Sequence, residues 1–402
     1  SQHPEALSEV WHPYPLSLRL FAWLRYAPFL LEGADEVFKQ AFLTSMDAHA
    51  RLLPELVEYD VGGNHLIKNL KALIAAACSL PKPANGLDGW LSQLKNEIDE
   101  QILPDGFHYE RSPSYHLQVL VDLIDIADLQ ETPPTWLSAT IGKMLPALAT
   151  MRHPDGGLAL FNDGDVGDEK LLKALDARFG PIKPLAMLPD AGYARLEAGD
   201  MVVIFDAGLC CPDHLTAHAH ADTLSFEMSV GTQRVIVNGG TYAYQDPLRN
   251  QFRGSASHCS IMVNGQNCAE VFGTFRLGRR PQNVELYREG DWIVGRHDGY
   301  RHLGVTVERR LRLTALGLEG EDRVLGNSEP SLTAYLHSPL EPSGPCDRIG
   351  SLYFTHDGKC ALSDHQSALE FYRLDRSCVM MLSANDRQHP NVIKWSLKKG
   401  NA

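Results

Sequence analysis

Residues 217–226 read AHAHADTLSF, and from Leu224 onward apolar and polar side chains alternate. Leu224, Phe226 and Met228 take the apolar positions, and polar residues stand between them. Successive side chains of a β-strand point to opposite faces of a sheet, so a period of two predicts a strand. The same period recurs over 305–311, and the second half of the chain is therefore predicted to consist of strands.

The first half of the chain has a helical period instead. Apolar residues recur three or four positions apart, as in Leu66 and Leu70, and predict about seven helices before residue 185. Helices followed by strands indicate segregated α and β regions, whereas a parallel sheet would need the two to alternate. We predict a helical domain over 1–185 and an antiparallel β-sandwich over 190–402. Two turn sequences are predicted to close hairpins: Asp357-Gly358 and Glu289-Gly290-Asp291.

The composition excludes several functions. The formal net charge is −13, whereas a protein that binds nucleic acid needs a basic surface. No apolar run approaches the ~20 residues that span a bilayer, and the first residues lack the layout of a signal peptide. We expect a soluble protein without membrane insertion, cytoplasmic or, if a leader has been removed, periplasmic or secreted. The eight cysteines form no CxxC pair and are predicted to be mostly reduced thiols.

The quoted stretch also carries two histidines that could act together. In an extended backbone, His218 and His220 point to the same face of the strand. Such a pair suits one metal ion, or a base beside a metal ligand. Two surface histidines near a loop are the alternative, and the His-x-His spacing alone leaves both interpretations open.

Further polar motifs lie at spaced positions around this stretch. They are Gly62-Gly63-Asn64-His65-Leu66, the segment 105–116, Pro154-Asp155-Gly156-Gly157 with Asn162-Asp163-Gly164, Asn238-Gly239-Gly240-Thr241-Tyr242, and His258-Cys259-Ser260. In this order they resemble the heparinase II/III family, from Trp11 to the region of residue 310. The resemblance implies a partial α/α toroid followed by an antiparallel β-sandwich, and a lyase that acts on an acidic polysaccharide. Family members usually have more helical sequence upstream, so we expect a processed or truncated form.

The chemistry of such a lyase explains why these residue types are useful. β-Elimination removes the C5 proton of a uronic acid, which requires that the neighbouring carboxylate be neutralised and the developing enolate stabilised. By resemblance, Asn64 and His65 contact that carboxylate, while Tyr115 and His218 act as acid and base. A tyrosine near a cationic group is expected to ionise more readily than usual. The predicted substrate contacts are Glu110, Arg111, Tyr242, Tyr244 and Arg253.

Structural roles are the alternative for several of these residues. Asn64 could cap a helix that starts at His65, and Tyr115 could be a core residue at the start of the next helical segment. The acidic segment 162–168 lacks the order of an EF-hand loop and is interpreted as a solvated loop, not a calcium site. One group of arginines suits carboxylates or sulfates but could equally be scattered over the surface: Arg249, Arg253, Arg276, Arg279 and Arg280.

The resemblance also implies one structural zinc ion and no organic cofactor. The matching ligand positions are His220, Asn238 and His258. The family has Asp at the middle position, so the carboxylate charge that favours a divalent cation is missing here. The sequence therefore leaves zinc binding open.

Three functions remain after this reading of the motifs. The first is a lyase for a uronic-acid polysaccharide, namely a glycosaminoglycan, alginate or a bacterial exopolysaccharide. The second is a toroid protein that binds a glycan without cutting it. The third, less favoured, is a metal-dependent hydrolase, which would need a further carboxylate placed to activate water. The sequence identifies neither the polymer, nor endo or exo action, nor whether the chain forms a homodimer.

Overall fold

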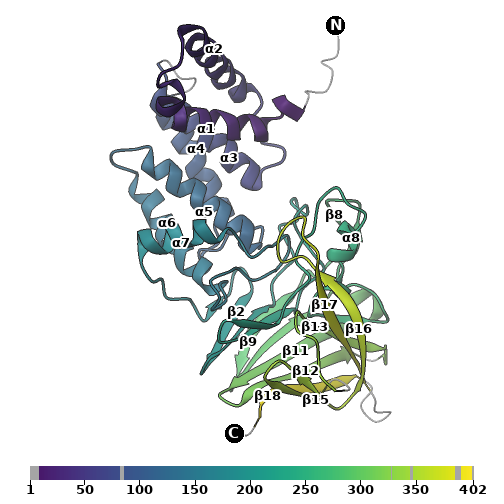
Figure 1. Ribbon diagram of the computed structural model, residues 1–402. Helices are drawn as coiled ribbons and strands as arrows, with labels where there is room; N and C mark the ends of the chain where they lie inside the picture. Colours follow the sequence, from purple (N-terminus) through teal and green to yellow (C-terminus); the bar gives the residue numbers. More distant parts are fainter. Residues whose placement is uncertain (1–8, 82–85, 327, 345–346, 385–390, 401–402) are drawn as a thin grey trace. The chain divides into compact units, whose positions relative to one another are not determined.

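The computed structural model describes residues 9–81, 86–326, 328–344, 347–384 and 391–400. Within these ranges the chain forms two compact units (Figure 1). The first unit contains the residues up to Ile102 together with Leu117–Met144, and the second contains Leu103–His116 together with the residues from Leu145 onward. The domain boundary at 185–190 stays a prediction.

Helices dominate the described chain before residue 185, as predicted. The α-helices there are α1 (Pro13–Leu31), α2 (Glu36–Leu52), α3 (Gly63–Ser79), α4 (Gly86–Gln101), α5 (Pro113–Asp128), α6 (Thr135–Thr150) and α7 (Glu169–Phe179), with short 3-10 turns at Glu9–Trp11 and Leu53–Glu55. Asp35 begins α2 by accepting a hydrogen bond from the backbone N–H of Phe38 at 2.8 Å. None of the described helices is both long and apolar enough to cross a membrane.

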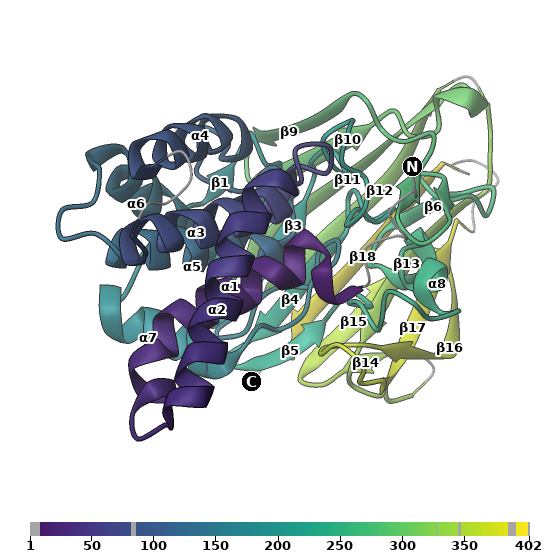
Figure 2. The same ribbon diagram turned by 90° about the horizontal axis from the view of Figure 1, so that it is seen from above.

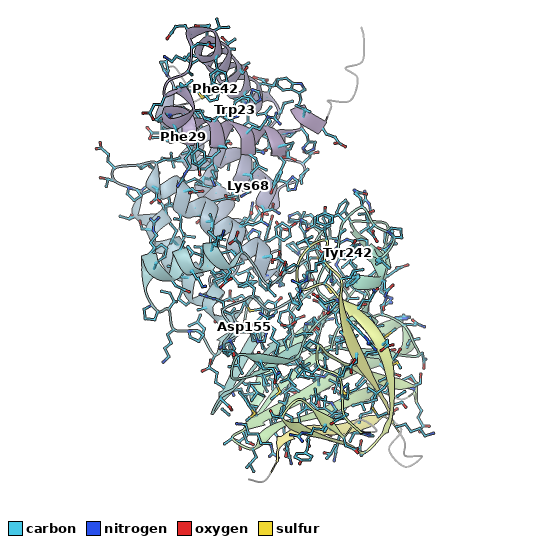
Figure 3. The ribbon with its side chains drawn as sticks, in the orientation of Figure 1. Trp23, Phe29, Phe42, Lys68, Asp155 and Tyr242 are labelled. Carbon is cyan, nitrogen blue, oxygen red and sulfur yellow. The ribbon has the colours of Figure 1, made fainter. Side chains whose placement is uncertain are left out.

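Helix α3 is the buried centre of the first unit. It contacts both α1 and α4, and its apolar face is almost fully buried. Lys68 (labelled in Figure 3) and Lys71 of α3 both donate to Asp122 of α5, at 2.7 and 2.9 Å. Removing one partner of such a buried ion group leaves an uncompensated charge, so these lysines hold α5 against α3.

The start of α3 differs from the capping alternative for Asn64. Gly62 is the N-cap residue and makes no side-chain cap hydrogen bond, and Gly62 and Gly63 have φ values of 68° and 56°. Glycine adopts this left-handed conformation without the steric cost of a Cβ atom. Asn64 therefore lies inside the first turn of the helix, and the interpretation of Asn64 as its cap is wrong.

The described residues of the second half form four antiparallel sheets, which confirms the predicted sandwich. A five-stranded sheet contains β1 (Met187–Leu188), β2 (Tyr193–Ala198), β3 (Met201–Asp206), β4 (Phe226–Val230) and β5 (Gln233–Ile236). A seven-stranded sheet contains, in spatial order, β14 (Arg348–Ile349), β15 (Leu352–His356), β18 (Val392–Lys399), β12 (Gly317–Gly326), β11 (Val305–Thr314), β10 (Trp292–His297) and β9 (Val284–Glu289). Figure 2 shows β9 to β12 crossing this sheet in turn.

The remaining strands form two smaller sheets. A four-stranded sheet orders β16 (Lys359–Ser367), β17 (Asp375–Ser383), β13 (Leu332–Ser338) and β6 (Ile261–Val263), while β7 (Val271–Phe272) pairs with β8 (Arg276–Leu277). A short helix α8 (Arg249–Phe252) and 3-10 turns at Ser255–Ser257 and Arg301–Leu303 lie in the connections. The strands β13 and β17 lie side by side in both views (Figures 1 and 2).

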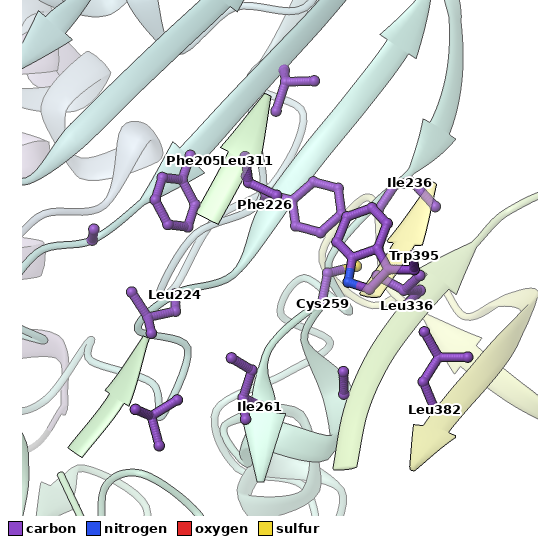
Figure 4. Packing of buried hydrophobic residues seen from close by; sticks show 14 of the residues in the cluster. Phe205, Leu224, Phe226, Ile236, Cys259, Ile261, Leu311, Leu336, Leu382 and Trp395 are labelled. Carbon is purple, nitrogen blue, oxygen red and sulfur yellow. The ribbon is translucent and has the colours of Figure 1, made fainter. Parts of the chain in front are cut away.

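The core of the sandwich surrounds one buried ion pair. The rings of Phe226 and Trp395 stack with centroids 5.3 Å apart (Figure 4). The guanidinium of Arg309 donates to both carboxylate oxygens of Asp322, at 2.6 and 3.0 Å, and to the carbonyl oxygen of Leu224 at 2.8 Å. The indole N–H of Trp395 also donates to Asp322, at 2.9 Å. These bonds satisfy the pair, as a fully buried charge requires.

The two predicted hairpins have different outcomes. Gly290 and Asp291 do close a hairpin, because Glu289 of β9 pairs with Trp292 of β10. Asp357-Gly358 does not, because β15 pairs with β18 whereas β16 pairs with β17, in another sheet. That turn carries the chain from one sheet of the sandwich to the other, so the hairpin prediction is wrong there.

Candidate active site

Tyr115 and His218 lie in contact within the second unit. Their ring centroids are 3.9 Å apart and the ring planes are inclined by 32°. Tyr115 stands in the first turn of α5, and His218 stands in the connection between β3 and β4. Both are nearly buried, with Tyr115 8% exposed and the side chain of His218 11% exposed. The interpretation of His218 as a surface residue near a loop is therefore wrong.

Hydrogen bonds connect three loops around this pair. The backbone N–H of Asp163 donates to the carbonyl oxygen of His218 at 2.9 Å, and the N–H of His220 donates to Oδ1 of Asn162 at 2.9 Å. The Ser112 hydroxyl donates to the carbonyl oxygen of Asp163 at 2.6 Å. Asn162 itself has a φ of 53°, a conformation that asparagine tolerates better than most residues. The three loops thus form one polar layer beside α5.

Asp163 stands at the centre of this layer and is fully buried. Its Oδ2 accepts from Nδ1 of His218 at 2.9 Å, and its Oδ1 accepts from Nε2 of His220 at 2.8 Å. Arg249 donates to both oxygens, and the bond to Oδ2 measures 2.8 Å. Burial alone would raise the pKa of Asp163, but the Arg249 guanidinium and the bonds from the two histidines hold that pKa well below its ordinary value.

The solvated-loop interpretation of 162–168 is therefore wrong for Asp163, which is fully buried, although Asp168 is exposed. Asp163 accepts hydrogen bonds from side chains of the surrounding loops. Asp165 accepts a hydrogen bond from the Ser114 hydroxyl at 2.8 Å. Asp168 is the N-cap of α7, where it accepts from the backbone N–H groups of Lys170 and Leu171. A count of acidic residues cannot separate these three roles, because each carboxylate finds its donors only in the folded chain.

The Tyr115 hydroxyl is hydrogen-bonded to a second tyrosine. Its oxygen lies 2.5 Å from the hydroxyl oxygen of Tyr244, whose ring lies 4.9 Å from the Arg249 guanidinium. Burial, with the neighbouring Tyr244, Asp163 and Glu110, raises the pKa of Tyr115 well above its ordinary value. This differs from the expected easier ionisation, because burial and the neighbouring acidic groups both disfavour the charged form of Tyr115. Tyr115 consequently stays protonated and can donate a proton.

The other predicted substrate contacts divide into two groups. Tyr242 (labelled in Figure 3) is half-buried beside Tyr372, and Glu110 is buried with Oε2 3.8 Å from Nε2 of His218. By contrast, Arg111 donates to the backbone carbonyl oxygens of residues 109, 190 and 191, and the buried Arg253 donates to those of residues 216, 219, 273 and 274. The contacts of these two arginines favour a role in holding loops over direct contact with substrate.

Asn64 and His65 belong to the first unit. Asn64 is 2% exposed. His65 is part-exposed and its Nδ1 lies 2.9 Å from Oε1 of the buried Glu58, while its ring lies 4.4 Å from that of Tyr14. A carboxylate on one ring nitrogen fixes the tautomer of a histidine and leaves the other nitrogen available. Glu58 was not among the predicted site residues, because no sequence motif linked it to His65.

Family models match both halves of the chain. The model for the heparinase II/III-like C-terminal region matches residues 180–385, and that for the heparinase II/III N-terminus matches residues 3–179. The chain belongs to the heparinase II/III family. The resemblance inferred from the spaced motifs is thereby confirmed.

Individual relatives of this heparinase II/III chain have different names. FtsZ-localized protein C of Caulobacter vibrioides is 29% identical over 314 residues, which cover 74% of this chain and 53% of that protein. The heparin-sulfate lyase of Bacteroides stercoris is 24% identical over 331 residues, covering 73% and 48%. The chain thus spans about half the length of these curated relatives.

Solved structures share the fold. A crystal structure of heparinase III superposes with a TM-score of 0.78 at 17% identity, covering 100% of this chain and 72% of that chain. The structure of the heparinase III BT4657 gene product gives a TM-score of 0.73 at 18% identity, covering 96% and 67%. At this identity the likeness shows the architecture of a toroid followed by a sandwich, which confirms the predicted fold class.

The zinc position implied by the family is only partly matched by the residues of this chain, because Nε2 of His258 is engaged in hydrogen bonds whereas its buried Nδ1 has no partner among the described residues. Burial lowers the pKa of His220 to about 4 and that of His258 to about 3, so each is a neutral ring with one proton near neutrality. Nε2 of His258 lies 3.0 Å from the carbonyl oxygen of Phe252, which can only accept, and 3.1 Å from Nδ1 of His220. A nitrogen that donates its proton cannot also bind a metal ion.

Asn238, at the third implied ligand position, is also a weak ligand for a divalent cation. Oδ1 of Asn238 accepts from the backbone N–H of Cys259 at 2.9 Å, and its amide nitrogen carries no negative charge. Among the residues that the structure describes, no group of three or more His, Cys, Asp or Glu side chains could hold a metal ion. A chain of hydrogen bonds runs from His258 through His220 to Asp163.

Metal removal should therefore leave the protein unchanged. We expect dialysis against EDTA to shift neither Tm nor the zinc content, which should be far below one equivalent per chain, because His220 is bonded to Asp163 and His258, and Asn238 supplies no negative charge. Elemental analysis and a thermal melt measure both. The matched comparison is Asn238→Asp, which restores the carboxylate of the family. One equivalent of zinc in the parent protein, lost together with stability on chelation, would contradict this expectation.

Proposed function

We propose that the chain cleaves a uronic-acid polysaccharide by β-elimination, with His218 as the base and Tyr115 as the acid. The observation that carries the proposal is the contact between the two side chains, each held by a buried partner: Asp163 on Nδ1 of His218 and Tyr244 on the Tyr115 hydroxyl. A side chain that transfers protons must be held within reach of the reacting atoms. The second unit contains both groups and both partners.

The proposed reaction balances without a cofactor. Nε2 of His218 takes the proton from C5, and the electron pair of that C–H bond forms the C4–C5 double bond. The bond from C4 to O4 breaks, and O4 leaves with its electron pair and receives the proton of the Tyr115 hydroxyl. The raised pKa of Tyr115 keeps that proton available. Asn64 and His65 are assigned to the substrate carboxylate on the family resemblance.

A glycan-binding protein without activity is the second candidate. The observation that favours it is the name of one relative, FtsZ-localized protein C, which refers to where that protein is found. A binding protein needs residues that contact the glycan but not a proton-transfer pair, so Tyr115 and His218 could then be changed without loss of function. The metal-dependent hydrolase is disfavoured, because His220 is engaged with His258 and Asp163.

A product assay separates these functions. The chain should be incubated with heparan sulfate, chondroitin sulfate, alginate and a bacterial exopolysaccharide, with and without EDTA, while ultraviolet absorbance is followed. Only a lyase makes an unsaturated uronate that absorbs, so we expect a rise with at least one polymer and no effect of EDTA. Binding of a polymer without any rise in absorbance would support the second candidate, and size analysis of products distinguishes endo from exo cleavage.

A further inference from the structure

Asp163 connects His218 to Arg249 and was assigned no function by the motifs. We propose that Asp163 is a positioning residue that fixes both the orientation and the tautomer of His218, leaving Nε2 as the proton acceptor. This inference rests on the proposed role of His218 as the base. Asp163 touches no reacting atom and acts only through the imidazole.

Asp163 holds His218 through two hydrogen bonds. Its backbone N–H donates to the carbonyl oxygen of His218 at 2.9 Å, and its Oδ2 lies 2.9 Å from Nδ1 of the same residue. The Tyr115 ring covers one face of the imidazole, at a centroid distance of 3.9 Å. The backbone, Nδ1 and one ring face of His218 are therefore all held in place. Nε2 of the imidazole can then point in only one direction.

The carboxylate of Asp163 also determines which ring nitrogen of His218 carries the proton. A carboxylate only accepts hydrogen bonds, so an ionised Asp163 requires the proton of neutral His218 to be on Nδ1. Nε2 then carries the lone pair. It lies 3.8 Å from Oε2 of Glu110, beyond hydrogen-bond distance. A protonated Asp163 could instead donate a hydrogen bond to Nδ1 of His218. The proton of His218 could then be on Nε2.

Several donors keep Asp163 ionised although it is fully buried. Arg249 donates to both of its oxygens, the Thr241 hydroxyl lies 3.2 Å from Oδ1, and His220 adds a bond at 2.8 Å. A buried carboxylate is retained only where an opposite charge and several donors compensate for lost water. Arg249, from the basic group noted in the sequence, thus acts on Asp163 and through it on His218.

The tautomer can be measured in the unmodified protein. We expect ¹⁵N NMR of the histidine-labelled chain, with His218 assigned by loss of its signals in His218→Gln, to show a protonated Nδ1 and an unprotonated Nε2 at the assay pH. A proton on Nε2, whether alone or together with one on Nδ1, would overturn the proposal. The measurement needs no substrate and no active enzyme, so its outcome is independent of whether the lyase proposal holds.

A variant tests the consequence for turnover. Asp163→Asn keeps the shape but offers an amide N–H to Nδ1, so we expect the proton of His218 to move to Nε2 and kcat to fall by about 10²- to 10⁴-fold, with KM changed little. The matched control is Asp322→Asn, which alters a buried carboxylate likewise held by an arginine, Arg309. The control should lower Tm without changing kcat or the His218 spectrum. An equal loss of kcat in both variants, or an unchanged tautomer in Asp163→Asn, would contradict the proposal.

The outcomes also separate this inference from the lyase proposal. If no polymer yields an unsaturated product while the spectrum shows the expected tautomer, the lyase proposal fails and the positioning of His218 by Asp163 stands. If the parent protein is an active lyase and its His218 carries the proton on Nε2, the lyase proposal stands and the positioning role fails. Should Asp163→Asn not fold, the spectrum of the parent protein still decides.

Discussion

Tyr115→Phe should lower kcat on the cleaved polymer by about two or more orders of magnitude, with the fold unchanged. The substitution removes the hydroxyl that would protonate O4 but keeps the ring that packs against His218. It also removes the 2.5 Å contact to Tyr244, which remains beside Arg249. Initial rates of absorbance increase, measured over a range of polymer concentrations, give kcat and KM separately.

Tyr300→Phe is the control for the loss of a buried hydroxyl. The Tyr300 hydroxyl donates to the carbonyl oxygens of Ile261 and Gln266, both at 2.9 Å, and takes no part in the candidate site. We expect a lower Tm and an unchanged kcat for this variant. Full activity of Tyr115→Phe on a polymer that the parent protein cleaves would show that Tyr115 is a core residue.

His218→Ala should lower kcat by about 10²- to 10⁴-fold, because no other described side chain in contact with Tyr115 is arranged as a neutral base. If His218 and Tyr115 act in one concerted step, the double variant should lose little more than either single variant. Rates of the two single variants and the double variant form a complete cycle. If the loss of kcat in the double variant equals the product of the losses in the two single variants, His218 and Tyr115 have independent roles.

His302→Ala serves as the control for the histidine change. His302 is exposed and its Nε2 lies 2.8 Å from Oε1 of Gln266, away from Tyr115. We expect it to alter neither kcat nor KM. A loss of kcat in His218→Ala that is accompanied by an equal loss of Tm would instead point to damaged loops, since His218 is also bonded to Asp163 through its backbone.

The sequence carried enough information for the class of fold. Phe226 and Met228 alternate within β4, and Leu66 and Leu70 recur on α3, since local backbone geometry alone sets these periods. Leu224 has a φ of 68° and lies with His218 and His220 in the connection before β4, so the prediction that these residues stand on the strand is wrong. Pairing between strands is not local. Asp357-Gly358 has the chemistry of a tight turn, but turn chemistry does not say whether the next strand folds back or crosses to another sheet.

The candidate site was predictable where spaced motifs carried it. Tyr115 and His218 were chosen from the sequence, and the structure brings them into contact. Asp163 was misjudged, although Asn162-Asp163-Gly164 was among the motifs, because acidic residues in a glycine-containing loop are usually solvated. Its donors, Arg249 and the two histidines, come from segments far along the chain. Only the folded backbone shows that they converge.

The place of β18 has a consequence for synthesis on the ribosome. This strand is the last in the described chain, yet it lies inside the seven-stranded sheet, between β12 and β15. Trp395, whose indole meets Asp322 in the core, belongs to it. A chain emerging from its N-terminus can pack α1 to α7 early, but β12 and β15 keep unpaired edges until residues 392–399 have left the exit tunnel. We expect nascent chains that stop short of residue 392 to be held by chaperones or to aggregate through those edges.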